Sequence, residues 1–363
     1  MAKHSFNPQE DPRYRGRGAN INPAGRFDTQ SHHIFDDGWQ DYRQDTASHR
    51  TTVTKEFPKT VLSKNQSPDV PFDRSVNPYR GCEHGCVYCF ARPSHGYLNL
   101  SSGVDFETQL YAKPNAAELL QGEIAKKNYV CRPIAFGTNT DPYQPIERKF
   151  EITRSVLEML TTYNHPFTVT SKSDLVLRDI DILRPMAEKQ MTCVGISITS
   201  LDHRLSRRME PRASSPAKRL AAIEALSSQG IPVILQLAPV IPAINDMEIE
   251  SILKAGRDAG ASQAIFIPVR LPFEVKDLFR KWLEAHFPDR ASKVITQITN
   301  MRGGKENDPR FGHRMRGSGP YAEIIHQRFK KLSNKLGFQG RKYDLDCSQF
   351  TPPSKPSNQL NLF

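Results

Sequence analysis

The chain has 363 residues, enough for about two domains of ordinary size or one large one. Hydrophobic residues make up 37% of it, below the ~45–50% of an ordinary globular chain, so part of the length is expected to form no packed core. No apolar run reaches the ~18 residues of a membrane-spanning helix, and the first residues lack the apolar segment of a secretory signal; we therefore expect a cytoplasmic protein with no membrane partner.

The net charge of +11 is unevenly distributed along the chain. Residues 276–363 carry 17 Lys and Arg against 8 Asp and Glu, whereas the preceding residues are nearly balanced. A clustered positive field attracts phosphates, so nucleic acid is a candidate partner of the basic C-terminal region. Solubility alone is the other interpretation of the same charge.

Residues 1–70 are poor in aliphatic residues and rich in Asn, Asp, Gly, Pro, Ser and Arg, which predicts a largely disordered N-terminal arm. From 71 to 275, strand-length apolar runs alternate with helix-length amphipathic segments. The expected strands lie near 75–80, 133–137, 166–170, 193–199, 232–238 and 263–268, and the expected helices near 115–127, 152–163, 178–189, 215–229, 247–259 and 274–285.

Several of these apolar runs are short and nearly continuous, as is typical of parallel strands covered on both faces. Six strand–helix alternations predict a parallel α/β fold, either a doubly wound sheet or a partial barrel. In a barrel, ligands gather at the carboxyl ends of the strands, so the residues just after each strand are candidates for a site.

The last quarter of the chain is expected to add a basic extension over 276–345 and a flexible tail over 346–363. The extension contains an Arg/Gly loop at 301–320, with Arg302, Arg310, Arg314 and Arg316, followed by an amphipathic helix at 321–336. Basic side chains interleaved with aromatic ones are typical of grooves that follow a nucleic-acid backbone. A lid over the barrel mouth is the alternative, and the two interpretations are compatible.

Three of the six cysteines, Cys82, Cys86 and Cys89, form a C-x3-C-x2-C motif just past the first expected strand. Thiolates are the usual ligands of iron–sulfur clusters, and the lack of a fourth local cysteine would leave one iron open to another ligand. Two alternatives remain: a zinc site with His84 as a fourth ligand, and three cysteines without a metal.

This motif in a parallel α/β context resembles the radical S-adenosylmethionine (SAM) superfamily, over about residues 75–270. The resemblance implies a partial (β/α)6 barrel of TIM type, with a [4Fe–4S] cluster on the three cysteines and SAM bound at the unique iron. It also implies reductive cleavage of SAM to a 5′-deoxyadenosyl radical that abstracts hydrogen from a substrate. An external electron donor such as flavodoxin or ferredoxin would serve the cluster.

Within the superfamily, the sequence looks most similar to the branch of spore photoproduct lyase, whose best-known member repairs a thymine dimer lesion in DNA. The resemblance implies SAM contacts at successive strand ends: the methionine end after the second strand, the carboxylate after the third, the ribose on the fourth and the adenine after the fifth. The cofactor-binding residues expected on this basis are Tyr88, Thr138, Asn139, Thr140, Lys172, Ser197 and Pro239.

One position departs from the lyase pattern. Thr138 stands where the lyase has a hydrogen-donating cysteine, and a hydroxyl O–H bond is far too strong to give up a hydrogen atom readily. We therefore expect no identical dimer reversal, and no catalytic hydrogen donor is assigned. Cys347 is a possible substitute, but a small, partly buried apolar role is the simpler interpretation for it, as for Cys131 and Cys193, which lie away from the expected site.

Other polar residues near the strand ends have ordinary structural interpretations beside functional ones. Glu210 and Arg219 either reach SAM or substrate or form an ion pair at a helix start, and Tyr143 either relays a hydrogen atom or belongs to a turn with Asp141. Three functions remain open: a radical SAM enzyme acting on nucleic acid in repair or modification, one acting on a protein or small molecule, and a zinc-stabilised nucleic-acid-binding protein without catalysis.

Overall fold

A seven-stranded sheet forms the centre of the protein in a computed structural model that describes residues 16–27, 50–338 and 344–353. Its strand order is β10-β9-β8-β7-β6-β3-β2; the first six strands are parallel, and β2 (Leu62–Lys64) pairs antiparallel with β3 at the edge. The parallel strands are β3 (Arg74–Val76), β6 (Ile134–Phe136), β7 (Phe167–Ser171), β8 (Thr192–Ser197), β9 (Val233–Val240) and β10 (Gln263–Pro268). Five of the six expected strands are therefore confirmed, whereas the first, expected over 75–80, is divided between β3 and β4 (Tyr79–Arg80), which belong to different sheets.

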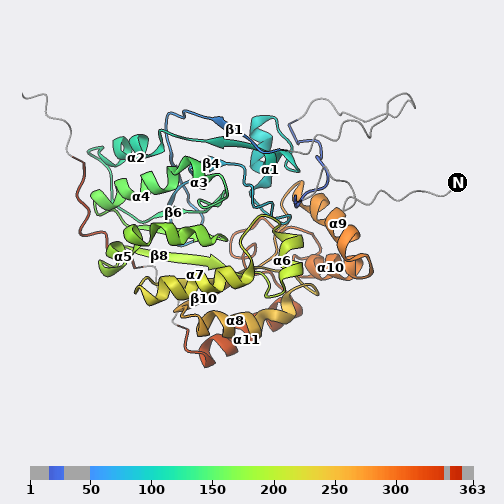
Figure 1. The fold of residues 1–363 in the computed structure, drawn as a ribbon. Helices are drawn as coiled ribbons and strands as arrows, with labels where there is room; N and C mark the ends of the chain where they lie inside the picture. The colour runs from blue at the N-terminus through green and yellow to red at the C-terminus, as the bar shows by residue number, and fades with distance from the viewer. Residues whose placement is uncertain (1–15, 28–49, 339–343, 354–363) are drawn as a thin grey trace, which may run out of the picture.

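A helix follows each parallel strand, and the α/β partial barrel expected from the sequence is confirmed (Figure 1). These helices are α2 (Ala116–Ile124), α4 (Ile152–Thr162), α5 (Ile180–Glu188), α7 (Pro216–Ser228), α8 (Ile249–Asp258) and α9 (Val275–His286). Among them, α7 begins where the Ser215 hydroxyl accepts a hydrogen bond from Lys218 N, with a proline in the first turn.

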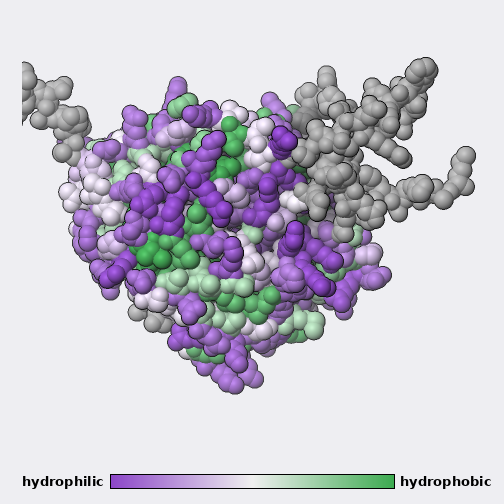
Figure 2. Space-filling model, viewed as in Figure 1, coloured by the Kyte–Doolittle hydropathy of each residue, from purple (hydrophilic) through white to green (hydrophobic). Residues whose placement is uncertain are grey.

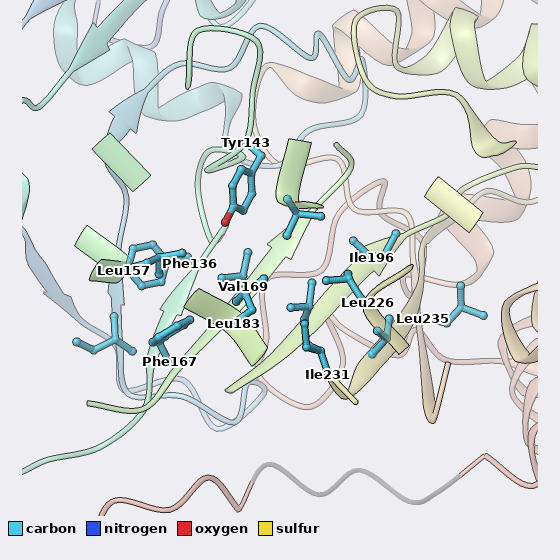
Figure 3. Close-up of a cluster of buried hydrophobic side chains, with 14 of the residues drawn as sticks. Phe136, Tyr143, Leu157, Phe167, Val169, Leu183, Ile196, Leu226, Ile231 and Leu235 are labelled. Carbon is cyan, nitrogen blue, oxygen red and sulfur yellow. The ribbon is translucent and has the colours of Figure 1, made fainter. Parts of the chain in front are cut away.

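The core lies between the sheet and these helices (Figure 3). Phe136, Phe167 and Leu235 from the strands meet Leu157 and Leu183 from the helices, and all five are fully buried. Because both faces of such strands are covered, they read as nearly continuous apolar runs, which is the pattern found in the sequence.

Smaller elements surround the strand ends that lead to the cysteines. A second sheet of order β1-β5-β4 joins β1 (Thr52–Lys55), β5 (Gln109–Ala112) and β4 (Tyr79–Arg80). The short helices are η2 (Arg92–Leu98), α1 (Asp105–Thr108), α3 (Glu147–Phe150), η3 (Asp174–Asp179), α6 (His203–Met209) and η4 (Asp246–Glu248). The strand β8 points toward the end of the molecule where α6, α9 and α10 lie (Figure 1).

The C-terminal extension contributes α10 (Pro288–Asn300) and α11 (Pro320–Lys335), with no regular element between them. The second helix and the loop before it match the sequence prediction, whereas α10 was not predicted as an element of its own. Residues 344–353 lie against the body of the protein, since Thr351 N donates to Tyr163 O (3.0 Å) and Asp346 N donates to Gln190 O (3.0 Å). The rest of the predicted tail, 354–363, lies outside the described residues.

The described parts of the predicted N-terminal arm are ordered rather than disordered. Residues 50–70 supply β1 and β2, and in the 16–27 segment Ala19 is buried. Gly18 and Ala19 donate their backbone N–H groups to the Glu107 carboxylate (2.9 and 2.8 Å). Residues 1–15 and 28–49 lie outside the description, and the domain boundaries themselves remain predictions.

Hydrophilic side chains dominate the molecular face drawn in Figure 2, with hydrophobic residues in small groups among them. Among the described residues, no helix is long and apolar enough to cross a membrane.

Candidate functional site

A cavity of about 530 Å³ extends along the inner face of the parallel strands, from residues near their amino ends, such as Pro133 and Cys193, to their carboxyl ends. Most of the residues that the sequence singles out lie in its wall. They are Cys86, Tyr88, Cys89, Thr138, Asn139, Lys172, Ser197 and Pro239, contributed by the cysteine loop and by the segments at β6, β7, β8 and β9. The chain thus gathers into one wall residues that are more than 150 positions apart. Cys82 and Thr140 are not part of this wall.

The cysteine loop, residues 82–89, follows β4 directly and is held by backbone contacts. Cys82 N donates to Phe106 O (2.9 Å) and Cys89 N donates to Cys86 O (3.2 Å). Gly85 has a φ of +68°, a conformation that suits glycine and lets the loop turn back between the first two cysteines. These contacts give the loop a defined shape.

Buried charges fix the loop from outside. Arg92, fully buried in η2, donates from Nε to Cys86 O (2.8 Å) and pairs with Glu107. Glu107 also accepts the two N–H groups of residues 18 and 19, and Gly18 lies so close to the Gly85 carbonyl oxygen that a Cβ there would overlap it. The N-terminal segment thus packs on the cysteine loop.

The three thiols are of a type that binds metals, but they do not form a site for a single metal ion. Burial raises the pKa of Cys82, with the charges of Asp141 and Cys86 adding to it, and burial raises that of Cys86 to about 12 although Lys172 opposes the change. Among the described residues, no three His, Cys, Asp or Glu side chains are arranged as a ready metal site. Cluster binding would require deprotonation of these thiols.

His84, the alternative zinc ligand, is engaged elsewhere. Its Nδ1 lies 3.3 Å from Asp141 Oδ2, and both side chains are buried. Asp141 also accepts hydrogen bonds from Ser171 Oγ (2.7 Å) and from the backbone N–H of Lys172 (2.7 Å). Burial by itself would raise the pKa of Asp141, but the His84 charge and these donors bring it down to about 2. Asp141 therefore stays ionised and fixes the end of β7.

Lys172 follows β7, and its side chain faces the cavity. No hydrogen bond or ion pair of its ammonium group occurs in the part of the chain that the structure describes. Burial lowers its pKa, but the charges of Cys86 and Glu210 outweigh this effect and raise it above the ordinary value. A protonated ammonium without a partner in a cavity fits the carboxylate of a ligand.

Behind the cysteines, a buried ion pair supports the end of β8. Arg219 pairs with Glu210, to which the Tyr88 hydroxyl also donates, and all three are buried. Arg219 Nη1 in turn donates to the backbone oxygen of Ser197 (3.0 Å). Of the two sequence interpretations for Glu210 and Arg219, the ion pair is correct, and this pair connects the predicted cofactor residues Tyr88 and Ser197.

Asn77, which the sequence analysis did not single out, organises the loop after β6. The Asn77 Nδ2 group donates a hydrogen bond to the Thr138 hydroxyl (3.0 Å), and Asn77 Oδ1 accepts one from Asn139 N (3.0 Å). Thr140 turns away, since its hydroxyl donates to Tyr79 O (3.4 Å). The loop thus presents Thr138 and Asn139 to the cavity, whereas only its backbone connects Thr140 to this wall.

Gln236 is a second residue that sequence reasoning missed. From β9 it lies across the barrel interior, accepting from Ser197 Oγ (3.4 Å) and donating from Nε2 to Thr170 Oγ1 (3.2 Å). The signal was one polar residue inside the apolar run Val233–Leu237. An inward polar side chain in such a strand needs partners, and here they are the residues near the cavity.

Three further residues lie differently from some of their sequence interpretations. Tyr143 is a core residue that donates to Asp179 (2.9 Å) and is not part of the cavity wall, so its turn interpretation holds (Figure 3). Cys193, expected away from the site, lines the cavity from β8, and burial raises its pKa to about 12. Cys347 is beside Cys131, at the opposite ends of the strands from the cysteine loop.

The Arg/Gly loop reaches the cavity, but most of its arginines are occupied. Arg302 is buried and donates to the backbone oxygens of residues 268, 269, 313 and 314. Arg310 pairs with Asp308 at the surface, and Arg314 pairs with Asp69. Arg302 is therefore a structural clamp that brings Arg314 and Met315 to the cavity wall.

Comparison with known proteins agrees with this geometry. Residues 76–255 match the family model of the radical SAM superfamily. An uncharacterized protein of Mycobacterium tuberculosis (strain ATCC 25618 / H37Rv) is 33% identical over 238 residues, covering 65% of this chain and 70% of that protein. A protein of Pseudomonas phage M6 named radical SAM Nalpha-GlyT isomerase is 24% identical over 270 residues, covering 72% of this chain and 52% of the phage protein.

Among solved structures, spore photoproduct lyase has the same fold. The lyase complexed with dinucleoside spore photoproduct superposes with a TM-score of 0.59 at 16% identity, covering 80% of this chain and 81% of the lyase. A mutant of that lyase with bound AdoMet and the same dinucleoside superposes with a TM-score of 0.53 at 15% identity, covering 78% of each chain. At this identity, the likeness concerns the fold alone.

Proposed function

This chain belongs to the radical SAM superfamily, and we propose that it cleaves SAM reductively at a [4Fe–4S] cluster held by Cys82, Cys86 and Cys89. When bound, the reduced cluster supplies the electron that splits SAM into methionine and a 5′-deoxyadenosyl radical, which abstracts hydrogen from the substrate. The protein is an enzyme of this superfamily. Its substrate and cofactor contacts are the subject of the proposal.

The observation that carries the proposal is the unpartnered Lys172 ammonium in the same cavity wall as Cys86 and Cys89. The charges of Cys86 and Glu210 raise the pKa of this ammonium, but it has no direct hydrogen-bonding partner among the described residues, so its position suits a ligand carboxylate next to the cysteines. SAM has such a carboxylate on its methionine end. Asp141 holds the backbone of Lys172, and Arg219 holds that of Ser197, so both proposed contacts are fixed before a ligand arrives.

The remaining proposed SAM contacts lie around the same cavity. Thr138 and Asn139 would contact the methionine end of SAM, Ser197 its ribose and Pro239 its adenine, and Tyr88 would lie beside the cluster. Asn245 fixes the Pro239 turn, because its Nδ2 donates to Pro239 O (2.9 Å). Thr140 contributes at most through its backbone, because its hydroxyl faces Tyr79.

For the wider setting, we propose a cytoplasmic enzyme that acts on nucleic acid. Radical SAM enzymes need an external electron donor, and flavodoxin or ferredoxin would serve. The positive charge of the C-terminal quarter supports a polyanionic substrate. A protein or small-molecule substrate is the second candidate, favoured by the internal pairing of Arg302, Arg310 and Arg314.

The test is anaerobic reconstitution followed by reduction in the presence of SAM, with 5′-deoxyadenosine measured by liquid chromatography. Slow formation of 5′-deoxyadenosine without substrate is expected, because one chain supplies all of the proposed cluster and SAM contacts. Protein that holds zinc instead of iron and forms no 5′-deoxyadenosine would instead support the non-catalytic zinc protein.

A further inference from the structure

The cavity wall contains four cationic side chains and no acidic one in the part of the chain that the structure describes. The four are Lys64, Lys172, Arg270 and Arg314. Lys172 lies beside the cysteines and is assigned to SAM by the proposed function. Three cations therefore remain for a different ligand, and their charge calls for an anionic one.

Arg270 is the most unusual of these three. It follows β10, is half-buried, and forms no ion pair among the described residues. Its Nε is buried without a hydrogen-bond partner, and Nη1 has only the Met315 sulfur as an acceptor (3.0 Å). Burial and the neighbouring Arg314 both lower its pKa. The Asp69 charge opposes this lowering, but no described carboxylate pairs directly with the guanidinium, so an anion that enters the cavity would stabilise it further.

The one nearby carboxylate is already committed to Arg314. Asp69 accepts from Arg314 Nε and from Gly312 N (2.6 Å), so both of its oxygens are used. Arg302 holds the same loop against the end of β10, as described above. The loop is thereby fixed with Arg314 and Met315 beside Arg270, whose guanidinium donates only to the Met315 sulfur among the described residues.

An exposed aromatic ring lies next to Arg270. The guanidinium carbon of Arg270 is 5.0 Å from the centre of the Phe90 ring, which lines the cavity and is 47% exposed. Phe90 directly follows Cys89, so it lies between the cysteine loop and the cationic side of the cavity. A ring exposed to this extent offers a surface on which a flat, aromatic group stacks.

From these contacts we infer that Arg270, Arg314 and Phe90 form a substrate subsite that binds one nucleotide unit, with its phosphate on the arginines and its base on Phe90. A guanidinium fork matches two phosphate oxygens, and the absence of carboxylates in the wall avoids repulsion. The inference rests on the proposed function, since it names the substrate class for the same cavity. Arg270 supplies the guanidinium without an ion pair among the described residues, and Arg314 of the 301–320 loop, held by Asp69, lies beside it in the cavity wall.

The experiment measures binding separately from SAM cleavage. Full-length protein of known iron content is titrated into a labelled single-stranded deoxyoligonucleotide of eight residues, and anisotropy is recorded at several salt concentrations. Arg270→Gln should weaken binding about 10- to 100-fold, the loss expected for a hydrogen bond to a charged group. It should also flatten the dependence of log K on log salt by about 0.7, one single-strand phosphate contact. Arg310→Gln is the matched control, because Arg310 pairs with Asp308 outside the cavity wall, and it should leave the affinity within about twofold.

Two further variants separate the parts of the subsite. Arg270→Lys keeps the charge but loses the fork, so its affinity should lie between those of wild type and Arg270→Gln. Phe90→Leu should weaken the binding of the oligonucleotide and of the deoxynucleoside 5′-monophosphates. It should leave the competition by inorganic phosphate unchanged. If the monophosphates compete for the site as well as the oligonucleotide does, at the same concentration of phosphate groups, the substrate is a free nucleotide.

Several results would overturn the inference. Wild-type affinity in Arg270→Gln, or a large loss of its melting temperature, would make Arg270 a structural residue, since removing an unpaired charge should not destabilise the fold. An acidic octapeptide that binds while the oligonucleotide does not would assign the cavity to a protein substrate. SAM cleavage without binding of any phosphate probe would refute the subsite alone, whereas phosphate binding without SAM cleavage would refute the proposed function alone.

Discussion

Replacing Asp141 by Asn removes the one carboxylate that fixes the end of β7 beside the cavity. The carboxylate accepts hydrogen bonds from Ser171 Oγ and Lys172 N (both 2.7 Å) and from Tyr143 N (2.9 Å), and it faces His84 Nδ1 at 3.3 Å. Asn is nearly isosteric but presents an N–H₂ group on one side. That group would face a donor, either the Lys172 N–H or the Tyr143 N–H, so at least one of these bonds is lost.

Two estimates of the loss of folding free energy in Asp141→Asn agree. The pKa of Asp141 is held at about 2, against ~3.9 for an unfolded Asp, and a difference of about two units corresponds to ~2–3 kcal/mol at neutral pH. Losing a hydrogen bond to a charged group costs ~1.5–3 kcal/mol in general. We therefore expect Asp141→Asn to lower the free energy of unfolding by about 2–3 kcal/mol at pH 7.

Urea denaturation at pH 7 and at lower pH measures this difference. Since the pKa of Asp141 is lower in the folded state than in the unfolded state, its contribution to the free energy of unfolding is complete above the unfolded pKa of ~3.9 and disappears as the pH falls through about 2. The difference in unfolding free energy between wild type and variant should therefore shrink by about half by pH 3. Asp181→Asn is the control, because this exposed partner of Arg154 should contribute at most ~1 kcal/mol. An Asp141→Asn protein as stable as wild type at pH 7, or a gap that is independent of pH, would refute the reasoning.

Three further predictions concern the surroundings of the cavity. Lys172→Ala should weaken SAM binding by about 1.5–3 kcal/mol in calorimetry, and an unchanged affinity would remove this residue from the site. Gly18→Ala should destabilise the fold by about 1–3 kcal/mol in urea, because the new methyl group overlaps a backbone oxygen of the cysteine loop; Gly122→Ala, in open space on α2, should be neutral or stabilising. Glu210→Gln should lower the free energy of unfolding by about 3–5 kcal/mol in the same assay, because it leaves Arg219 buried without its anion. Replacement of both residues by Met should recover much of this loss, which a purely local packing effect would not do.

The parallel core was predictable because its pattern is local. Each strand is a short apolar run, each helix an amphipathic segment, and Gly230 and Gly260 both end a helix just before a strand, with φ of +74° and +99°. The cysteine motif was predictable for the same reason, since its spacing lies within eight residues. The family resemblance, combined with the positions of the strand ends, then indicated Lys172 and Ser197 as residues of one site.

The partners of these residues were not predictable, because they come from distant segments. Nothing near Gly18 in the sequence indicates that it packs on Gly85, and composition alone made its surroundings appear disordered. The arginines of the 301–320 loop look equivalent in sequence. Only the tertiary contacts show that Arg302 donates to backbone oxygens. They also show that Arg270, outside that loop, lines the cavity with a buried Nε that has no hydrogen-bond partner among the described residues.

The central claim is that three cysteines hold one iron–sulfur cluster at the edge of this cavity. The direct measurement is iron and sulfide per chain after anaerobic reconstitution, with the visible spectrum, for wild type and for the single replacements of Cys82, Cys86 and Cys89 by Ala. Cys193→Ala is the matched control, a buried cysteine of the same cavity wall. The account predicts about four irons for wild type and for Cys193→Ala, and loss of the cluster in each of the other three. Stoichiometric zinc in wild type, or a full iron content in any of those three variants, would contradict it.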